Sequence, residues 1–221
     1  MKQLILLILA CLPLTALAQS EWQRPLTPSE RQEKAKREKA PKTTTEAPNE
    51  KDAPYIGPGI VPEVDGRVVF TLDTDVPGRT AESIYRTVYA ALDSLSMAEE
   101  QIESSIVLYN ETEHAIVGKY NEWLTFSSHA LSLDRTRFKY TIFARCTDQH
   151  LHLTLERLSY AYEERRDTPL LVSAEDWITD AKAVNKKGTA LRVAQRKFRR
   201  CTVDRVNALF GTIRQALGQS K

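Results

Sequence analysis

The chain lacks the residues and runs that mark several protein classes. Its three cysteines are too few for a disulfide-dense scaffold, and its eight glycines and ten prolines are too few for a collagen-like or low-complexity chain. Neither sign of charge dominates, because 31 basic residues stand against 29 acidic ones and the formal net charge is only +2. The totals therefore indicate no polyanionic partner. With 42% hydrophobic residues, the chain is expected to form one main soluble domain.

The N-terminus has the three parts of a secretory signal peptide. Lys2 precedes an apolar run over residues 4–12, and a small-residue A-x-A stretch ends at Ala18. The apolar run is shorter than the roughly 20 residues that a membrane-spanning helix needs. We therefore expect a signal peptide over residues 1–18, cleavage after Ala18, and a mature chain that starts at Gln19 and has no transmembrane helix. Such a chain is exported to the periplasm, the cell envelope or the medium. Lipidation at Cys11 is the alternative, but the stretch before it is short.

Residues 19–60 have the composition of a flexible, charged linker rich in Pro, Lys and Glu. Between residues 20 and 54 the only large apolar side chains are Trp22 and Leu26. A segment that cannot bury apolar surface stays solvated. Its eight basic and seven acidic residues nearly cancel, which argues against a polybasic arm for nucleic acid. We expect this tether to lead into a folded domain over residues 61–221.

From about Val64 onward, the hydrophobic pattern predicts an α+β domain. Apolar residues alternate over residues 67–73, which predicts a strand, and Thr80 can cap a helix with an apolar stripe. Strand-like runs follow at residues 105–109, 115–126, 137–146 and 150–162. The pattern turns helical after Ser173 and again from about Lys197. This order is typical of an antiparallel sheet with helices packed on one face.

The last two strand-like runs form a hairpin whose register can be predicted. A two-residue turn at Asp148-Gln149 pairs each apolar residue of one strand with an apolar residue of the other. The predicted pairs are Cys146 with Leu151, Ala144 with Leu153, and Ile142 with Leu155. Beyond these pairs the apolar parity shifts by one residue, which predicts a β-bulge near Glu156-Arg157.

Four short stretches carry a family resemblance through their order and spacing. They are Asp65-Gly66-Arg67-Val68-Val69-Phe70, Val76-Pro77-Gly78, Asn185-Lys186-Lys187-Gly188-Thr189 and Lys197-Phe198-Arg199-Arg200. Over residues 64–217 the chain resembles the secreted Bacteroidetes family of domains of unknown function that has a TATA-binding-protein-like (TBP-like) fold. The resemblance implies a signal peptide, the order β-α-β-β-β-β-α and no assigned activity. It supplies no catalytic motif, and the DNA binding of the fold's namesake is an analogy of fold alone.

Motifs of common enzyme chemistry are missing from the sequence. It contains no G-x-S-x-G elbow, no phosphate-binding glycine loop and no H-E-x-x-H helix. His150 and His152 share one face of a strand and could form half of a metal site, but Arg145 is expected opposite His152 and opposes metal binding. Glu122 has the parity of buried neighbours, and a second bulge is expected to expose it. We expect no catalytic residue, cofactor or metal ion.

Charge is distributed unevenly along the chain. Residues 182–221 contain eleven basic residues and one acidic one, whereas residues 55–181 contain eleven basic and twenty-one acidic residues. The densest cationic clusters are formed by Lys186, Lys187, Arg196, Lys197, Arg199 and Arg200. They could form a surface for an anionic polymer or another anionic partner. The interpretation that we favour is a basic helix that complements the acidic part of its own chain and is otherwise solvated. In that case, replacing Arg199 and Arg200 by alanine should barely change the melting temperature.

Three functions remain open at this point. The favoured one is a non-catalytic envelope or secreted module that binds an envelope protein or an anionic polymer; nucleic acid is not expected for an exported chain. The alternative is a carrier of small apolar ligands with a pocket between the sheet and the C-terminal helix. The aromatic residues that could line such a pocket are Trp123, Phe126, Phe138 and Tyr140. A hydrolase without a recognisable motif comes third.

Cleavage of the signal peptide leaves two cysteines in an oxidising compartment. Cys146 lies on the apolar face of its strand, and Cys201 lies at the edge of the apolar stripe of the last helix. A disulfide between them would tie the helix to the sheet, provided that the two Cα atoms lie within about 7 Å. We favour two unpaired thiols that pack as small hydrophobic side chains.

Overall fold

The computed structural model divides the chain into two units, Met1–Thr45 and Glu46–Lys221. The structure describes residues 50–129, 132–164 and 167–219, all of which belong to the second unit. The predicted signal peptide, its cleavage site after Ala18 and residues 19–49 of the predicted linker lie outside the described residues. They stay predictions.

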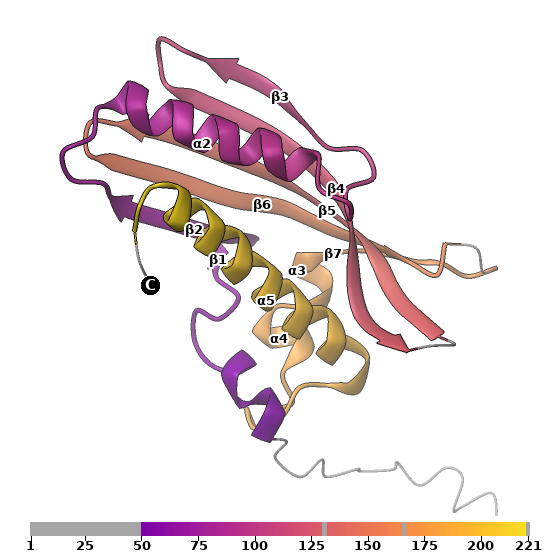
Figure 1. Ribbon diagram of the computed structural model, residues 1–221. Helices are drawn as coiled ribbons and strands as arrows, with labels where there is room; N and C mark the ends of the chain where they lie inside the picture. Colours follow the sequence, from indigo (N-terminus) through magenta and orange to yellow (C-terminus); the bar gives the residue numbers. More distant parts are fainter. Residues whose placement is uncertain (1–49, 130–131, 165–166, 220–221) are drawn as a thin grey trace, which may run out of the picture. The chain divides into compact units, whose positions relative to one another are not determined.

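The described residues form a seven-stranded antiparallel sheet with helices on one face (Figure 1). In chain order the elements are η1 (Glu50–Tyr55), β1 (Glu63–Val64), β2 (Arg67–Asp75), α2 (Ala81–Ser96), β3 (Ser105–Asn110), β4 (Ala115–His129), β5 (Ser132–Thr147), β6 (His150–Tyr162), β7 (Leu170–Ser173), α3 (Ala174–Trp177), α4 (Asp180–Ala183) and α5 (Val193–Ala216). The strand order is β1-β2-β6-β5-β4-β3, with β7 paired to β6. The predicted order β-α-β-β-β-β-α is confirmed by β2, α2, β3 to β6 and α5. None of the described helices combines the length and the hydrophobicity that crossing a membrane requires.

Helix α2 begins at the residue that the sequence predicts. The Thr80 hydroxyl accepts a hydrogen bond from the Ser83 N–H at 3.3 Å, which satisfies one of the free donors of the first turn. The apolar stripe of α2 is buried against the sheet, where the Tyr120 hydroxyl of β4 donates to the Leu92 carbonyl at 3.0 Å. A local cap and a local apolar period thus place α2 on the sheet.

The β5–β6 hairpin has the predicted register. Cys146 pairs with Leu151, Ala144 with Leu153, and Ile142 with Leu155. The register then shifts, and Arg157 adopts a left-handed backbone with φ of 58°. The predicted bulge is therefore confirmed, and it returns Leu158 and Tyr160 to the buried face of the sheet.

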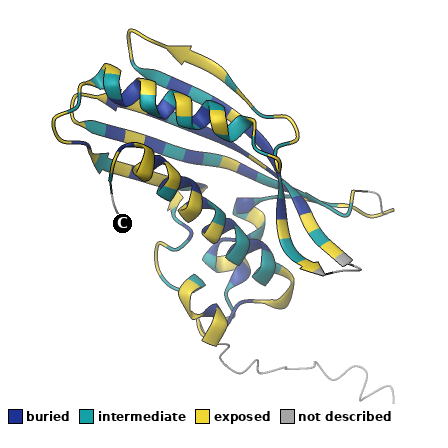
Figure 2. Cartoon of the chain, viewed as in Figure 1, coloured by how far each residue is buried: buried dark blue, intermediate teal, exposed yellow. Residues whose placement is uncertain are grey.

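Helix α5 covers the buried face of the sheet and closes the core. Figure 2 shows that the buried residues of α2 and α5 lie on the sides that face the sheet. Phe198 of α5 contacts Tyr160 edge to face with 5.2 Å between the ring centroids, and Tyr160 stacks on Phe138 at 5.4 Å. Phe138 and Tyr140 are thus core residues, whereas Trp123 lies on the opposite face under the Arg135 guanidinium at 3.9 Å. The four aromatic residues predicted to line an apolar pocket do not surround one cavity.

The folded domain begins earlier than the sequence predicts. Asp52 of η1 is fully buried, and its carboxylate accepts hydrogen bonds from the Arg196 side chain at 3.0 Å and the Leu191 N–H at 3.4 Å. The Tyr55 hydroxyl donates to Asp204 of α5 at 2.9 Å. Residues 50–60 therefore belong to the domain and not to the linker, because charged and polar groups that look solvated in the sequence find partners on α5.

Candidate binding cleft between helix α2 and the β3–β4 turn

The six cationic residues predicted to form an anion-binding surface do not assemble into one. The four on α5 lie within ion-pair distance of acidic residues of the same chain. The pairs are Arg196–Asp52 at 3.0 Å, Lys197–Asp134 at 2.9 Å, Arg199–Asp180 at 2.5 Å and Arg200–Asp52 at 3.8 Å. Lys186 and Lys187 are exposed in the loop before α5. Complementarity within the chain, the interpretation favoured from the sequence, therefore accounts for much of the basic charge of α5.

Arg199 corrects the sequence prediction most clearly, because its side chain is fully buried. Its Nε donates to the Tyr55 carbonyl at 2.8 Å, its Nη1 to the Ile178 carbonyl at 2.7 Å and its Nη2 to Asp180 at 2.5 Å. One guanidinium thus joins η1 and the α3–α4 connection to α5. It is a structural residue and no part of an exposed surface.

Glu122 also differs from the prediction. Its side chain is only 1% exposed, and its carboxylate accepts two hydrogen bonds from the Arg205 guanidinium, each at 2.7 Å. The bulge in β4 lies further along, between Thr125 and Ser127, and therefore does not expose Glu122. Burial and the Glu122 carboxylate raise the pKa of the neighbouring Tyr140 well above its usual value. A buried, fully paired carboxylate of this kind fixes α5 on β4 and offers no free acid.

His150 and His152 lie on the exposed face of the sheet, across from two aspartates of β2. His150 Nδ1 lies 2.9 Å from Asp75 and its Nε2 lies 3.0 Å from Asp73, while His152 Nδ1 lies 2.7 Å from Asp73. Arg145 pairs with His152 in the ladder, as predicted. Within the described parts of the chain, no group of three or more potential ligands is arranged to hold a metal ion. The two histidines are therefore engaged in hydrogen bonds that link β2 to β6.

The two cysteines of the folded domain carry free thiols in this structure. Cys146 is buried on the covered face of β5, and burial raises its pKa to about 12. Cys201 is half-buried on α5, and its pKa is also raised by burial. Both thiols are thus poor nucleophiles at neutral pH.

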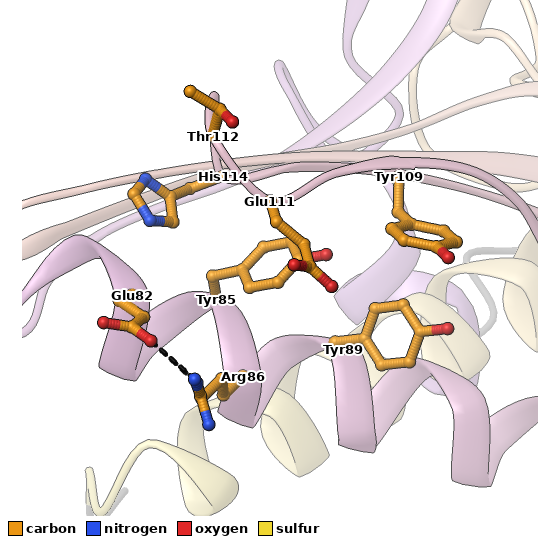
Figure 3. A pocket seen from close by; sticks show the side chains of 8 residues that line it. All are labelled: Glu82, Tyr85, Arg86, Tyr89, Tyr109, Glu111, Thr112 and His114. Carbon is orange, nitrogen blue, oxygen red and sulfur yellow. Dashed lines mark hydrogen bonds and ion pairs between the residues drawn. The ribbon is translucent and has the colours of Figure 1, made fainter.

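Sequence reasoning did not single out a cleft of about 750 Å³ between α2 and the β3–β4 turn. Figure 3 shows the eight side chains that line it, which are Glu82, Tyr85, Arg86, Tyr89, Tyr109, Glu111, Thr112 and His114. The first four come from successive turns of one face of α2, because positions i, i+3, i+4 and i+7 of a helix lie in line. That spacing was the available signal, but the strand-end partners on the other wall could not be read from it.

Aromatic rings form a continuous row through this cleft. The centroids of His114 and Tyr85 lie 5.8 Å apart, those of Tyr85 and Tyr89 lie 6.0 Å apart, and those of Tyr89 and Tyr109 lie 5.7 Å apart. In the part of the chain that the structure describes, none of the three tyrosine hydroxyls in the row makes a side-chain hydrogen bond. These hydroxyls are therefore available to a ligand.

Acidic side chains give the cleft and its surroundings a negative charge. Glu82 accepts a hydrogen bond from Arg86 at 2.6 Å, whereas the Glu111 carboxylate lies beside Tyr85 (Figure 3). Burial and then Glu111 raise the pKa of Tyr85, so its hydroxyl stays protonated. Residues 81–118, which form α2, β3 and the start of β4, contain seven acidic residues and one basic one, a net charge of −6. The electrostatics of the cleft favour a cation.

The wall opposite α2 is held by the turn between β3 and β4. The Asn110 side-chain oxygen accepts hydrogen bonds from the Thr112 and Glu113 N–H groups, both at 2.9 Å. The backbone of His114 is left-handed, with φ of 48°, and its carbonyl accepts a hydrogen bond from the Cys146 N–H at 2.9 Å. The turn therefore presents Glu111 and His114 from a fixed position.

A solved structure from Bacteroides ovatus, described as a DUF4468 family protein, has the same fold. It is 37% identical to this chain, covers 78% of it and 98% of its own length, and superposes with a TM-score of 0.71. This chain is a member of the DUF4468 family. The family model, a domain of unknown function with a TBP-like fold, matches residues 70–161. The resemblance found in the sequence is thereby confirmed.

A second structure, a TBP-like protein from Parabacteroides distasonis, supports the fold assignment. It is 18% identical, covers 73% of this chain and 99% of its own, and has a TM-score of 0.56, so it shows the fold alone. Among curated proteins, none matches this chain. All eight residues of the cleft fall inside the segment that matches the DUF4468 model. The cleft is therefore built by the family's own domain, whose description assigns a fold and no activity.

Proposed function

We propose that this DUF4468 protein is an exported, non-catalytic binding module whose ligand site is the cleft between α2 and the β3–β4 turn. The observation that carries the proposal is the row of three tyrosine rings beside the Glu111 carboxylate. The ligand group that fits this chemistry is an ammonium or guanidinium cation. Export is inferred from the signal peptide predicted in the sequence.

Two attractive interactions act on a cation in the cleft. A cation within about 6 Å of an aromatic ring gains roughly 0.5–2 kcal/mol, more as the site is desolvated. A carboxylate such as Glu111 adds a direct charge interaction, and the tyrosine hydroxyls can accept hydrogen bonds from the N–H groups of the cation. The same negative charge repels an anionic polymer, so the partner class suggested by the basic C-terminal residues has less support here.

The arrangement of the cleft residues supports binding over catalysis. A nucleophile or general base acts through a positioned hydrogen bond to a partner group. His114, the one histidine lining the cleft, meets the Tyr85 ring edge to face at 5.8 Å, and Glu82 is paired with Arg86. Among the described cleft residues, these contacts leave rings and one carboxylate facing the open volume. That set recognises charge and shape.

Titration with short charged peptides tests the proposed site. We expect triarginine to bind and to shift the amide resonances of Tyr89 and Glu111, whereas polyphosphate should not. Because each interaction is worth about 1 kcal/mol, Glu111→Gln and Tyr109→Ser should each weaken triarginine binding by roughly fivefold. The matched control, Lys186→Ala with Lys187→Ala, should leave it unchanged. Polyphosphate binding that the lysine variant abolishes, or triarginine binding that ignores both cleft variants, would overturn the proposal.

Intact-mass measurement on cell fractions tests export. The protein should be found in the envelope, periplasm or medium with Gln19 as its first residue. A dominant species that retains Met1, or one that is acylated at Cys11, would contradict an unlipidated exported module.

A further inference from the structure

Strand β3 is an edge of the sheet that the described chain leaves open. It ends the strand order, and Figure 1 shows it at the margin of the sheet, with α2 and β4 on its inner side. Three consecutive large apolar residues are exposed on it, Val107 by 45%, Leu108 by 66% and Tyr109 by 56%. The strand contains no charged residue and no proline. Natural proteins normally protect an edge with such residues, because the backbone groups of an open edge pair readily with another chain.

The opposite edge of the sheet is protected, which makes the open edge of β3 more significant. There, β1 pairs with one end of β2, and the Glu175 carboxylate accepts a hydrogen bond from the Val68 N–H at 2.9 Å. At the other end of β2, the Gln219 side chain donates to the Asp75 carbonyl. Among the described residues, the backbone of β3 makes ladder hydrogen bonds to β4 alone.

The charges around β3 determine which partner suits this edge. Glu103 precedes the strand and Glu111 follows it, within a segment of net charge −6. Antiparallel pairing of β3 with β3 of a second copy would bring the acidic ends of both strands together, and like charges across a strand pair are destabilising. A strand with basic side chains would instead be attracted along the whole edge.

We propose that β3 is a docking edge at which an extended, basic peptide segment of a partner protein adds an eighth strand to the sheet. This inference rests on the proposed function, because the docked segment would place one of its cationic side chains in the tyrosine cleft. Tyr109 connects the two surfaces, since it lies on β3, contacts Tyr89 of α2 with 5.7 Å between ring centroids and lines the cleft. An added strand lies about 4.8 Å from β3, and its alternate side chains point to the same face as Tyr109. Main-chain hydrogen bonds supply affinity in this mode, and alternate side chains supply specificity.

A pair of peptides of identical charge separates strand addition from simple cation binding. The first is a blocked hexapeptide of alternating Lys and Val, and the second is the same peptide with the amides of one edge N-methylated. We expect the first peptide to bind the mature chain about tenfold more tightly and to slow amide hydrogen exchange in β3. The methylated peptide keeps its charges but cannot donate to the edge.

Two variants at one exposed position sharpen the test. Leu108→Lys places a like charge on the docking edge and should weaken the unmodified hexapeptide by about fivefold, whereas Leu108→Glu should not weaken it. Equal binding of both peptides without protection of β3 would refute strand addition and leave cation binding in the cleft intact. Binding of neither peptide would refute both proposals. Self-association that Leu108→Lys abolishes would show a second copy at this edge and overturn the basic partner.

Discussion

Replacing Arg199 by alanine should strongly destabilise the domain, although the residue sits in the most basic stretch of the sequence. Its fully buried guanidinium donates to the carbonyls of Tyr55 and Ile178 and to the Asp180 carboxylate. Alanine would leave the two carbonyls without their donor and a space where the guanidinium was. The contacts of η1 and of the α3–α4 connection with α5 would be lost together.

The magnitude follows from the groups left unsatisfied. A buried acceptor without its partner costs about 1–3 kcal/mol, and the lost packing adds to the two carbonyls. The Asp180 side chain is 46% exposed and can be solvated, so the loss of its ion pair contributes little. The expected decrease in the free energy of unfolding is about 3–5 kcal/mol, a large part of a domain's usual 5–15 kcal/mol. At about 2–4 °C per kcal/mol, the melting temperature should fall by roughly 10 °C.

Thermal and urea denaturation of the mature chain measure this effect against two matched variants. Arg200→Ala removes a neighbouring arginine whose side chain is 33% exposed and lies 3.8 Å from Asp52, so it should cost less than about 1 kcal/mol. Asp180→Asn keeps both carbonyl hydrogen bonds and should also cost less than Arg199→Ala. A melting temperature of Arg199→Ala within about 2 °C of the wild type, or equal to that of Arg200→Ala, would refute the reasoning.

Three further predictions concern the core, the exposed histidines and the thiols. Leu209→Asp should abolish cooperative urea unfolding, because it buries a carboxylate without a partner at a position only 4% exposed. Hydrogen bonding to Asp75 raises the pKa of His150 above its usual 6.5, so this interaction stabilises the fold fully below that pH and is lost as the pH rises through the folded pKa. NMR titration should show a raised midpoint for His150, and Asp75→Asn should lower it; an unchanged midpoint would contradict the contact. Thiol counting after denaturation without reductant should find two free thiols, from Cys146 and Cys201, and a count of none would show a disulfide.

Features set by neighbouring residues were predictable from the sequence. The Thr80 cap, the apolar stripe of α2, the register of the β5–β6 hairpin and the bulge at Arg157 all follow from a period of 3.6 or 2 and from turn chemistry within a few residues. The start of the domain was misplaced, because η1 has no apolar period and is held by Asp52, which reaches a partner 144 positions away.

The candidate site could be predicted only in part. The spacing of Tyr85 and Tyr89 places both rings on one face of α2, but nothing local indicates that Tyr109 and Glu111 form the facing wall. That wall depends on β3 folding back along β4 and on the angle at which α2 crosses them. A local pattern reports the orientation of side chains within one element, and a cleft requires the distance between two.

The sequence by itself determined the secondary structure, the strand register and the family, because each depends on short-range periods and on the order of short motifs. Only the tertiary structure decided which charges are buried. Glu122 and Arg205 lie 83 positions apart and meet as a buried pair, while Arg199 and Arg200 are neighbours in the chain with opposite exposures. The physical reason is that the cost of a charge depends on its solvent and its partner, and both are set by packing between elements that the chain brings together from far apart.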